Sequence, residues 1–290
     1  MIRFDGQVAL ITGAGKGIGR AYAETLAARG AKVVVNNRKH AGEAVGSADQ
    51  VVAAIRAAGG EAVANYDSIE SEGAGQRMVD QALSAFGDLH ILMCNAAVGP
   101  RGMLHKQTEQ LMRDTVEINV FGSVEPVRAA MAHMRAKKYG RILLTTSGAG
   151  IGGNIGFAVY GATKAAMHGF AASATLEADR AGILINVISP GALTNMTKWM
   201  LELEGFDATG RAAEMPVQSV AECAAYMVSK EFDGRAEIWG VVGGKIHVTR
   251  LLASKGIDIP HDQMTAENIA GLKSQIRDLT DARLVEIKPE

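Results

Sequence analysis

A glycine-rich turn between a short aliphatic run and an amphipathic segment is the feature that most constrains the fold of this chain. The run Val8–Thr12 enters the turn TGAGKGIG, residues 12–19, and apolar side chains then recur at helical spacing as far as Leu26. Gly30 is well placed to end this helix, and a second aliphatic run follows at Val33–Asn36. A strand, a helix and a second strand within about 30 residues are typical of the βαβ unit of a parallel sheet.

The alternation of short aliphatic runs with helical segments continues along the chain. It predicts a single doubly wound Rossmann-type α/β domain over residues 1–250, with helices on both faces of a parallel sheet of about seven strands. Further strands are expected at 62–66, 91–95, 142–146, 183–189 and 237–242. Further helices are expected at 49–58, 75–86, 108–137 with a bend near Asn119, 158–181 and 220–229. Residues 251–290 are expected to form a polar, partly helical C-terminal extension.

The charge and composition exclude several classes of partner. The 290 residues carry 30 basic and 31 acidic side chains, mixed along the chain, so we expect neither nucleic acid nor a membrane as partner. No signal peptide or run of membrane-spanning length is visible. The two cysteines, Cys94 and Cys223, lack metal-ligand spacing, so neither a metal site nor a disulfide framework is expected. A reducing compartment, the cytoplasm, is the expected location.

The glycine loop suggests a ligand. Glycine at 13, 17 and 19 permits a tight turn, close approach of backbone N–H groups to a pyrophosphate, and close packing of helix on strand. Loops that merely turn also use glycine, so the pattern alone is weak. Its place after a strand and before an amphipathic helix favours a dinucleotide.

At these residues the chain resembles the short-chain dehydrogenase/reductase family, and the resemblance covers roughly residues 5–248. CNAA at 94–97 is similar to the family's Asn-Asn-Ala-Gly, which braces the central strands. Cys94 and Ala97 depart from that motif, and Asn95 keeps it. Asp67 falls where family members contact the adenine.

The ISPG stretch at 188–191 matches the family's Pro-Gly turn beside the nicotinamide, with Thr194 placed to reach the carboxamide or a phosphate. The cofactor-binding residues expected from the loop and the resemblance are Thr12, Gly13, Lys16, Gly17, Ile18, Gly19, Asn37, Arg38, Asp67, Asn95, Tyr160, Lys164, Pro190, Gly191 and Thr194.

Four residues form the candidate catalytic set. YGATK places Tyr160 and Lys164 four residues apart on one helix face, Ser147 lies thirteen residues before Tyr160, and Asn119 lies in the preceding long helix. Hydride transfer between an alcohol carbon and a nicotinamide requires a group that takes or returns the hydroxyl proton. A phenol has a pKa of about 10, and a neighbouring ammonium such as that of Lys164 is expected to lower it.

By resemblance, Lys164 also holds the nicotinamide ribose, Ser147 hydrogen-bonds the substrate oxygen, and Asn119 holds a water that relays protons. Taken singly, each residue is more often a packed tyrosine, a solvated lysine, a strand-end hydroxyl or a helix-bending amide. Their joint occurrence behind the glycine loop favours an enzyme.

The end of the second strand bears on cofactor choice. NAD-selective proteins place a carboxylate there to bind the adenosine ribose, and that carboxylate repels a 2′-phosphate. This chain has Asn37 followed by Arg38, and Lys16 lies in the glycine loop, so the three could pair a 2′-phosphate. The alternative is a pair of surface bases on a loop. We therefore favour NADP(H), with NAD(H) as the alternative.

The substrate is less constrained by the sequence. Residues 193–216 carry methionines and a tryptophan, and they form either a mobile substrate lid or a plain core helix. GAKVVVNN, GGEAVANYDS, KYGRI and EIWGVVGGKIHVTRLLASKG resemble the (3R)-hydroxyacyl-CoA dehydrogenase region of type 2 multifunctional β-oxidation enzymes. The resemblance implies a bulky apolar hydroxy or oxo substrate, a CoA thioester or a hydroxysteroid.

Two other functions stay open at this point. The chain could be a 3-oxoacyl reductase acting on carrier-protein thioesters, or a catalytically silent dinucleotide-binding scaffold. The resemblance further implies a homo-oligomer, a tetramer or dimer, with the helices of Asn119 and Tyr160 at one interface.

Overall fold

An eight-stranded sheet organises the molecule in the computed structural model, which describes residues 1–39, 42–194 and 214–285. The strand order is β3-β2-β1-β4-β5-β6-β7-β8, and every neighbouring pair is parallel except β7 and β8. The chain winds outward from β1 in both directions, which creates a switch point between β1 and β4. The strands are β1 (Val8–Ile11), β2 (Lys32–Asn36), β3 (Glu61–Asn65), β4 (Ile91–Cys94), β5 (Gly140–Thr145), β6 (Ile183–Gly191), β7 (Ile238–Val242) and β8 (Lys245–Thr249).

Helices cover both faces of this sheet, and two buried apolar clusters lie between the layers. One cluster joins the sheet to α1, α2 and α10, and the other joins it to α3, α5 and α7. The helices are α1 (Gly17–Ala28), α2 (Ser47–Ala57), α3 (Ala74–Phe86), α4 (Glu109–Val116), α5 (Gly122–Lys137), α6 (Gly148–Ile151), α7 (Ala158–Ala178) and α10 (Val217–Met227). The predicted doubly wound α/β fold is therefore confirmed.

The sheet has one strand more than predicted. A turn at Gly243 and Gly244 reverses the chain, and β8 returns antiparallel to β7 as the edge strand. Gly243 has a φ of 57°, in the left-handed region that a two-residue hairpin turn requires. The Gly-Gly pair between two β-branched runs was the sequence signal for this hairpin.

The long helix expected at 108–137 is interrupted near Asn119, where the sequence predicted a bend. Between α4 and α5 the backbone makes one π-helical turn, η2 (Glu117–Phe121), in which the hydrogen-bond register changes. Elsewhere the boundaries shift slightly, since α7 ends in the 3-10 turn η3 (Asp179–Ala181). The sequence did not predict α6 or the 3-10 turn η1 (Leu104–Lys106).

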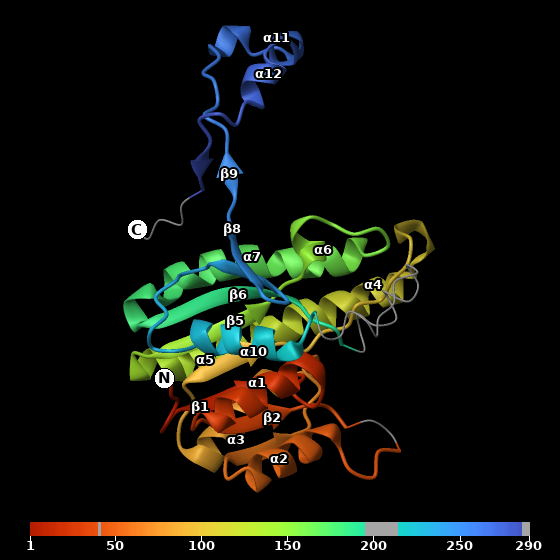
Figure 1. Cartoon of the computed structure of the whole chain (residues 1–290). Helices are drawn as coiled ribbons and strands as arrows, with labels where there is room; N and C mark the ends of the chain where they lie inside the picture. Colours follow the sequence, from red (N-terminus) through yellow and green to blue (C-terminus); the bar gives the residue numbers. More distant parts are fainter. Residues whose placement is uncertain (40–41, 195–213, 286–290) are drawn as a thin grey trace.

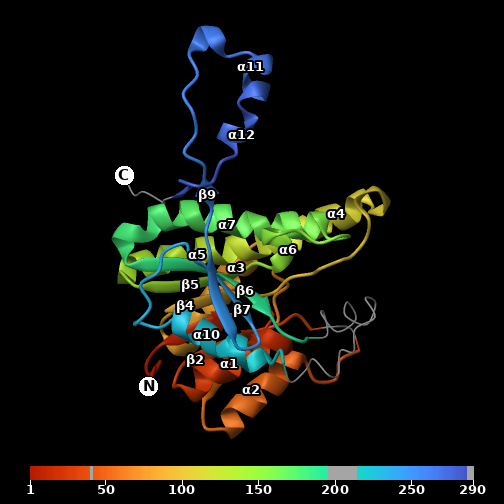
Figure 2. The ribbon, with the colours of Figure 1, turned by 45° about the horizontal axis from the view of Figure 1, so that its top comes forward.

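After β8 the chain leaves the body as an arm, residues 251–285, which projects away from the sheet in both views (Figures 1 and 2). The arm contains β9 (Leu252–Ala253), η4 (His261–Gln263), α11 (Ala266–Gly271), α12 (Lys273–Ile276) and β10 (Arg283–Leu284). β9 pairs antiparallel with β10. No arm residue belongs to either buried cluster.

Residues 193–216 and the possibility of a membrane-spanning helix are the two remaining sequence expectations. The expected lid or core helix at 193–216 lies almost entirely outside the described residues, which stop at 194 and resume at 214. In the part of the chain that is described, no helix is long and apolar enough to cross a membrane.

Candidate active site

A cleft of about 600 Å³ opens at the carboxyl ends of the central strands, beside the switch point. This is where open α/β sheets bind their ligands. The cleft gathers residues from the glycine loop, from the ends of β2, β4, β5 and β6, and from α7. The predicted site residues that line it are Gly13, Lys16, Gly17, Ile18, Asn37, Arg38, Asp67, Asn95, Ser147, Tyr160, Lys164, Pro190 and Thr194.

The glycine loop adopts a shape that side chains would prevent. Gly13 and Gly17 have φ values of 63° and 54°, in the left-handed region. A Cβ at Gly13 would lie 2.8 Å from Ala96 Cα. A Cβ at Gly19 would lie 2.6 Å from Asn95 Nδ2 and closer still to the Gly13 carbonyl oxygen. Gly19 does not line the cleft. Its lack of a side chain lets the start of α1 pack closely on the loop.

Thr12 and Asn95 support this loop from the protein side. The Thr12 hydroxyl accepts hydrogen bonds from the backbone N–H groups of Asn95 and Ala96, both at 3.1 Å. Asn95 Nδ2 donates to the carbonyl oxygens of Thr12 and Gly13, both at 3.2 Å. Thr12 is buried and does not line the cleft, and its expected part in cofactor binding stays a prediction. Through these two hydrogen bonds, Asn95 at the end of β4 holds the chain that follows β1.

The glycine loop has the features of a turn that can hold the pyrophosphate of a dinucleotide. At Gly17, the nearest atom to an added Cβ is Thr194 Cγ2 at 3.5 Å, which is ordinary van der Waals contact, so the left-handed φ rather than crowding favours glycine there. The loop precedes the N-terminus of a 12-residue helix, whose backbone N–H groups and dipole favour an anion. Gly191, predicted to contact the cofactor, does not line the cleft, since its Cα faces the side chain of Val242 on β7.

Ser147, Tyr160 and Lys164 meet at the opposite end of the cleft from Asn37 and Asp67. Ser147 follows β5 and begins α6, where its hydroxyl accepts from Ala149 N at 3.2 Å. The short helix α6 lies against α7 because two glycines allow it. A Cβ at Gly150 would lie 2.8 Å from Ala165 N, and one at Gly161 would lie 2.7 Å from the Ala149 carbonyl oxygen. These two glycines bring Ser147 to Tyr160, and the sequence reasoning missed them.

The ionisation of Tyr160 and Lys164 follows from burial. Burial lowers the pKa of Lys164 from 10.5 to about 8, and Nζ donates to the Thr145 carbonyl oxygen at 3.0 Å. Burial raises the pKa of Tyr160, and a hydrogen bond with Ser147 opposes that rise. The causes of the pKa shift at Tyr160 are burial and the hydrogen bond with Ser147, so the expectation that the Lys164 ammonium lowers this pKa stays a prediction.

Asn119 lies behind the cleft, and its side-chain amide is occupied. Oδ1 accepts from Val98 N at 2.8 Å, while Nδ2 donates to Val98 O at 2.8 Å and to Thr163 Oγ1 at 3.0 Å. Asn119 is completely buried and does not line the cleft. Both amide hydrogens are used, so the expected water would have to bind elsewhere than on this N–H pair. The side chain instead fixes Val98, which lines the cleft.

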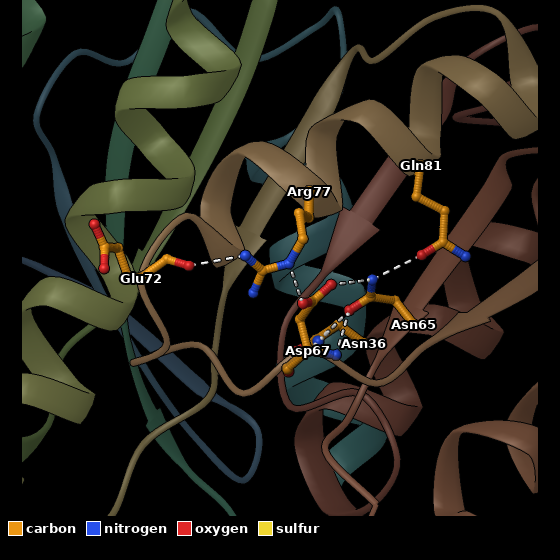
Figure 3. Close-up of polar contacts among 6 residues, drawn as sticks. All are labelled: Asn36, Asn65, Asp67, Glu72, Arg77 and Gln81. Carbon is orange, nitrogen blue, oxygen red and sulfur yellow. Dashed lines mark hydrogen bonds and ion pairs between the residues drawn. The ribbon is translucent and has the colours of Figure 1, made fainter.

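At the other end, the predicted adenine contact Asp67 belongs to a polar network that covers the carboxyl ends of β2 and β3 (Figure 3). Its carboxylate accepts from Arg77 Nε at 2.7 Å and from Asn65 Nδ2 at 2.9 Å. Its backbone carbonyl oxygen accepts from Asn36 Nδ2 at 2.9 Å. The network therefore fixes the position of Asp67 on the wall of the cleft.

The two bases named for cofactor selectivity each face an acid. Arg38 Nη1 lies 3.4 Å from Glu70 Oε1, and Lys16 Nζ lies 3.8 Å from Glu43 Oε1. Both ion pairs are partly exposed, so each is weak. Nothing local in the sequence indicates that Glu43 and Glu70 lie at this corner, because they approach the two bases only in the folded chain.

Comparison with known proteins identifies the class of this molecule. The model of the short chain dehydrogenase family matches residues 7–203. A short-chain type dehydrogenase/reductase of Mycobacterium tuberculosis is 34% identical over 286 residues, which are 97% of this chain and 98% of that protein. The peroxisomal multifunctional enzyme type 2 of Drosophila melanogaster is 35% identical over 97% of this chain but only 47% of its own length.

Solved structures agree with these sequence relatives. The full-length multifunctional enzyme type 2 of Drosophila melanogaster superposes with a TM-score of 0.81 at 30% identity, covering 98% of this chain and 48% of that one. A short chain dehydrogenase of Mycobacterium avium gives a TM-score of 0.82 at 28% identity, covering 97% and 96%. The chain belongs to the short-chain dehydrogenase family. Within it, the chain is related to the dehydrogenase domain of the type 2 multifunctional enzymes.

Proposed function

We propose that this chain interconverts a secondary alcohol and a ketone by hydride transfer to or from a nicotinamide dinucleotide. The observation that carries the proposal is that Ser147, Tyr160 and Lys164 line the same cleft as the glycine loop. The nicotinamide ring, when bound, would accept or supply the hydride. The chain's own residues would bind the substrate oxygen and move its proton.

Tyr160 is the proposed acid and base. Because burial raises the pKa of Tyr160, the phenol keeps its proton near neutrality, which suits a proton donor to a carbonyl oxygen. Ser147 would hydrogen-bond the same oxygen. Lys164 carries its charge below pH about 8 and would bind the nicotinamide ribose from beside Thr145.

Replacing the phenol tests this mechanism. Tyr160→Phe should lower kcat by roughly 10²–10⁴, the range that positioned proton transfer contributes. The matched control is dinucleotide affinity, which should change little because the ring is retained. Unchanged turnover in Tyr160→Phe would make the mechanism wrong. A wild-type chain that binds dinucleotide but turns over nothing in a broad carbonyl and alcohol panel would favour the silent scaffold.

For the substrate we propose a bulky apolar hydroxy or oxo compound, either a 3-hydroxyacyl-CoA or a hydroxysteroid-like alcohol. Kinship with the multifunctional enzymes supports an acyl thioester. A second candidate is a carrier-protein 3-oxoacyl reductase, because a 3-oxoacyl-(acyl-carrier-protein) reductase of Escherichia coli is 34% identical over 79% of this chain. A panel of hydroxyacyl-CoA, acyl-carrier-protein, steroid and small aromatic substrates, followed by cofactor absorbance, distinguishes these possibilities.

We favour NADP(H) over NAD(H) as the cofactor. The end of β2 has neutral Asn37 in place of a repelling carboxylate, and Lys16 and Arg38 line the same corner. A clear preference for NAD(H) in kcat/KM would contradict this proposal. Asn37→Asp should shift the ratio toward NAD(H), because the new carboxylate would repel a 2′-phosphate.

We also propose a homo-oligomer, a tetramer or dimer, with α4, η2 and α7 at one interface. Leu111, Val116 and Phe121 expose between 38% and 50% of their surface along α4 and η2. Light scattering should give a multiple of the 30.4 kDa chain mass, and Phe121→Glu should reduce it. A wild-type monomer would contradict the proposal.

Two buried free thiols support the cytoplasm as the location, although several relatives are named as peroxisomal.

A further inference from the structure

The side-chain amide of Asn37 is held in one orientation at the end of β2. Its Nδ2 donates to Ser47 Oγ at 2.8 Å and to the Arg38 carbonyl oxygen at 3.1 Å. A carbonyl oxygen can only accept, so the amide nitrogen must lie on this side. Among the residues that the structure describes, Oδ1 of Asn37 accepts no hydrogen bond. The oxygen is therefore the polar end of the amide that remains for a ligand in the cleft.

Three elements enforce this orientation. Ser47 is 4% exposed at the start of α2, so its hydroxyl is fixed in the protein interior. The glycine loop closes over the pair, because a Cβ at Gly15 would lie 2.8 Å from Asn37 Cγ and closer still to Ser47 Oγ. The loop is tied to β2 by Ala14 N, which donates to the Asn36 carbonyl oxygen at 2.8 Å. Rotation of the amide would turn Oδ1 toward the Arg38 carbonyl oxygen and lose that bond, in a space that leaves little freedom.

We propose that Ser47 determines cofactor specificity by turning the oxygen of Asn37 toward the adenosine ribose, so that the site binds NAD(H) as well as NADP(H). This inference rests on the proposed function. A neutral amide oxygen accepts a hydrogen bond from the 2′-hydroxyl of NAD(H), as a carboxylate at this position does. It does so without the negative charge that excludes a 2′-phosphate.

The same orientation limits the preference for NADP(H). The oxygens of a 2′-phosphate need donors, and Asn37 has already given both N–H groups to the protein. Lys16 and Arg38 supply positive charge, but Glu43 and Glu70 face them and reduce it. NAD(H) gains one hydrogen bond at its adenosine ribose, and NADP(H) gains only a reduced electrostatic attraction at its 2′-phosphate. The dissociation constants of NAD(H) and NADP(H) should therefore lie within about tenfold of each other.

Equilibrium binding to the whole 290-residue chain tests the proposal. Calorimetric titration with NAD⁺ and with NADP⁺ should give Kd values within about tenfold of each other. Ser47→Ala removes one acceptor and frees the amide to donate to the phosphate, so the ratio should move about three- to tenfold toward NADP⁺. The helix start should survive, because Gly46 N donates to Asp49 Oδ2 at 3.2 Å rather than to Ser47. A thermal melt checks that the variant is folded.

The matched control is Ser47→Ala in a chain from which the Asn37 amide has been removed. Asn37→Ala and Asn37→Ala/Ser47→Ala should have the same Kd ratio, because Ser47 acts only through Asn37. Binding of both dinucleotides with a ratio that Ser47→Ala leaves unmoved would overturn this inference alone. So would an effect of Ser47→Ala that persists in the Asn37→Ala background. Binding of neither dinucleotide would overturn the proposed function and this inference with it.

Discussion

At the scale of single residues, the most unusual feature of the site is a lysine that is buried away from water. The Lys164 side chain is 3% exposed and has no carboxylate partner among the described residues. Its ammonium is stabilised by one carbonyl oxygen, so burial depresses the pKa to about 8. The neighbouring thiol of Cys94 is buried as well, and burial raises its pKa to about 12, so it offers no counter-charge.

Lys164 should make the stability of the protein depend on pH. The unfolded chain keeps this proton up to pH about 10.5, whereas the folded chain keeps it only up to about 8. Between these values the unfolded state binds more protons, so the free energy of unfolding rises with pH. Relative to Lys164→Met, the wild type should gain about 3 kcal/mol across this window. Urea unfolding of both proteins on either side of the window measures the difference. Parallel pH profiles would contradict the prediction.

The glycine loop should tolerate no side chain at Gly19. Gly19→Ala would place a methyl group within 2.6 Å of Asn95 Nδ2 and nearer to the Gly13 carbonyl oxygen, so the backbone must shift. We expect a loss of at least about 1–3 kcal/mol in stability and weaker dinucleotide binding. Gly271→Ala is the control, because nothing lies within 4 Å of its Cβ position. Thermal melts and calorimetry report both quantities, and equal behaviour of the two variants would refute the packing argument.

At the scale of elements, the π-helical turn η2 is what joins the long helix pair α4–α5 to the cleft. The turn brings Asn119 to the segment after β4, where its amide bonds both backbone groups of Val98. It also reaches across to Thr163 on α7, one residue before Lys164. One buried side chain thus fixes the positions of two walls of the cleft relative to each other.

Removal of this amide should loosen both walls. Asn119→Ala leaves the N–H and C=O of Val98 without partners, which should cost about 2–3 kcal/mol of stability. Dinucleotide affinity should also fall, because Val98 lines the cleft. Gln110→Ala on the exposed face of α4 removes only a surface hydrogen bond and should change neither quantity. Chemical denaturation and calorimetry make the comparison, and a stable Asn119→Ala with normal affinity would contradict it.

At the scale of the whole molecule, the body and the arm contribute differently to stability. The buried clusters end at Val241, so residues 251–285 add nothing to the core of the described chain. Leu251, Leu252, Leu279 and Leu284 are more than half exposed. The arm leaves the body beyond the edge strand β8 (Figure 1).

Shortening the chain should therefore leave the body stable. A variant that ends at Arg250 should unfold within about 4 °C of the full chain, because no core contact is lost. Leu26→Ala, at a core position that is 1% exposed, should lose about 2–5 kcal/mol and serves as the comparison. Scanning calorimetry measures both. A large fall in Tm for the shortened chain would mean that the arm packs on another copy of the chain.

Several features could be predicted because they depend on neighbours in the sequence. The strand–glycine loop–helix unit needs only hydrophobic period and left-handed glycines, and the helix carrying Tyr160 and Lys164 sets their spacing by itself. The predicted residues that failed to line the cleft are Thr12, Gly19, Asn119 and Gly191. Each lies next in sequence to a lining residue and supports it, and whether a residue lines the cleft or supports it depends on tertiary packing.

The sequence by itself determined the doubly wound α/β fold and the place of the glycine loop, because local periodicity and turn chemistry specify them. Only the tertiary structure decided which groups face each other across long separations, as Glu70 faces Arg38 and Ser47 holds Asn37. It alone decided the titration of Tyr160 and Lys164 as well, because burial depends on the packing of segments far apart in the chain.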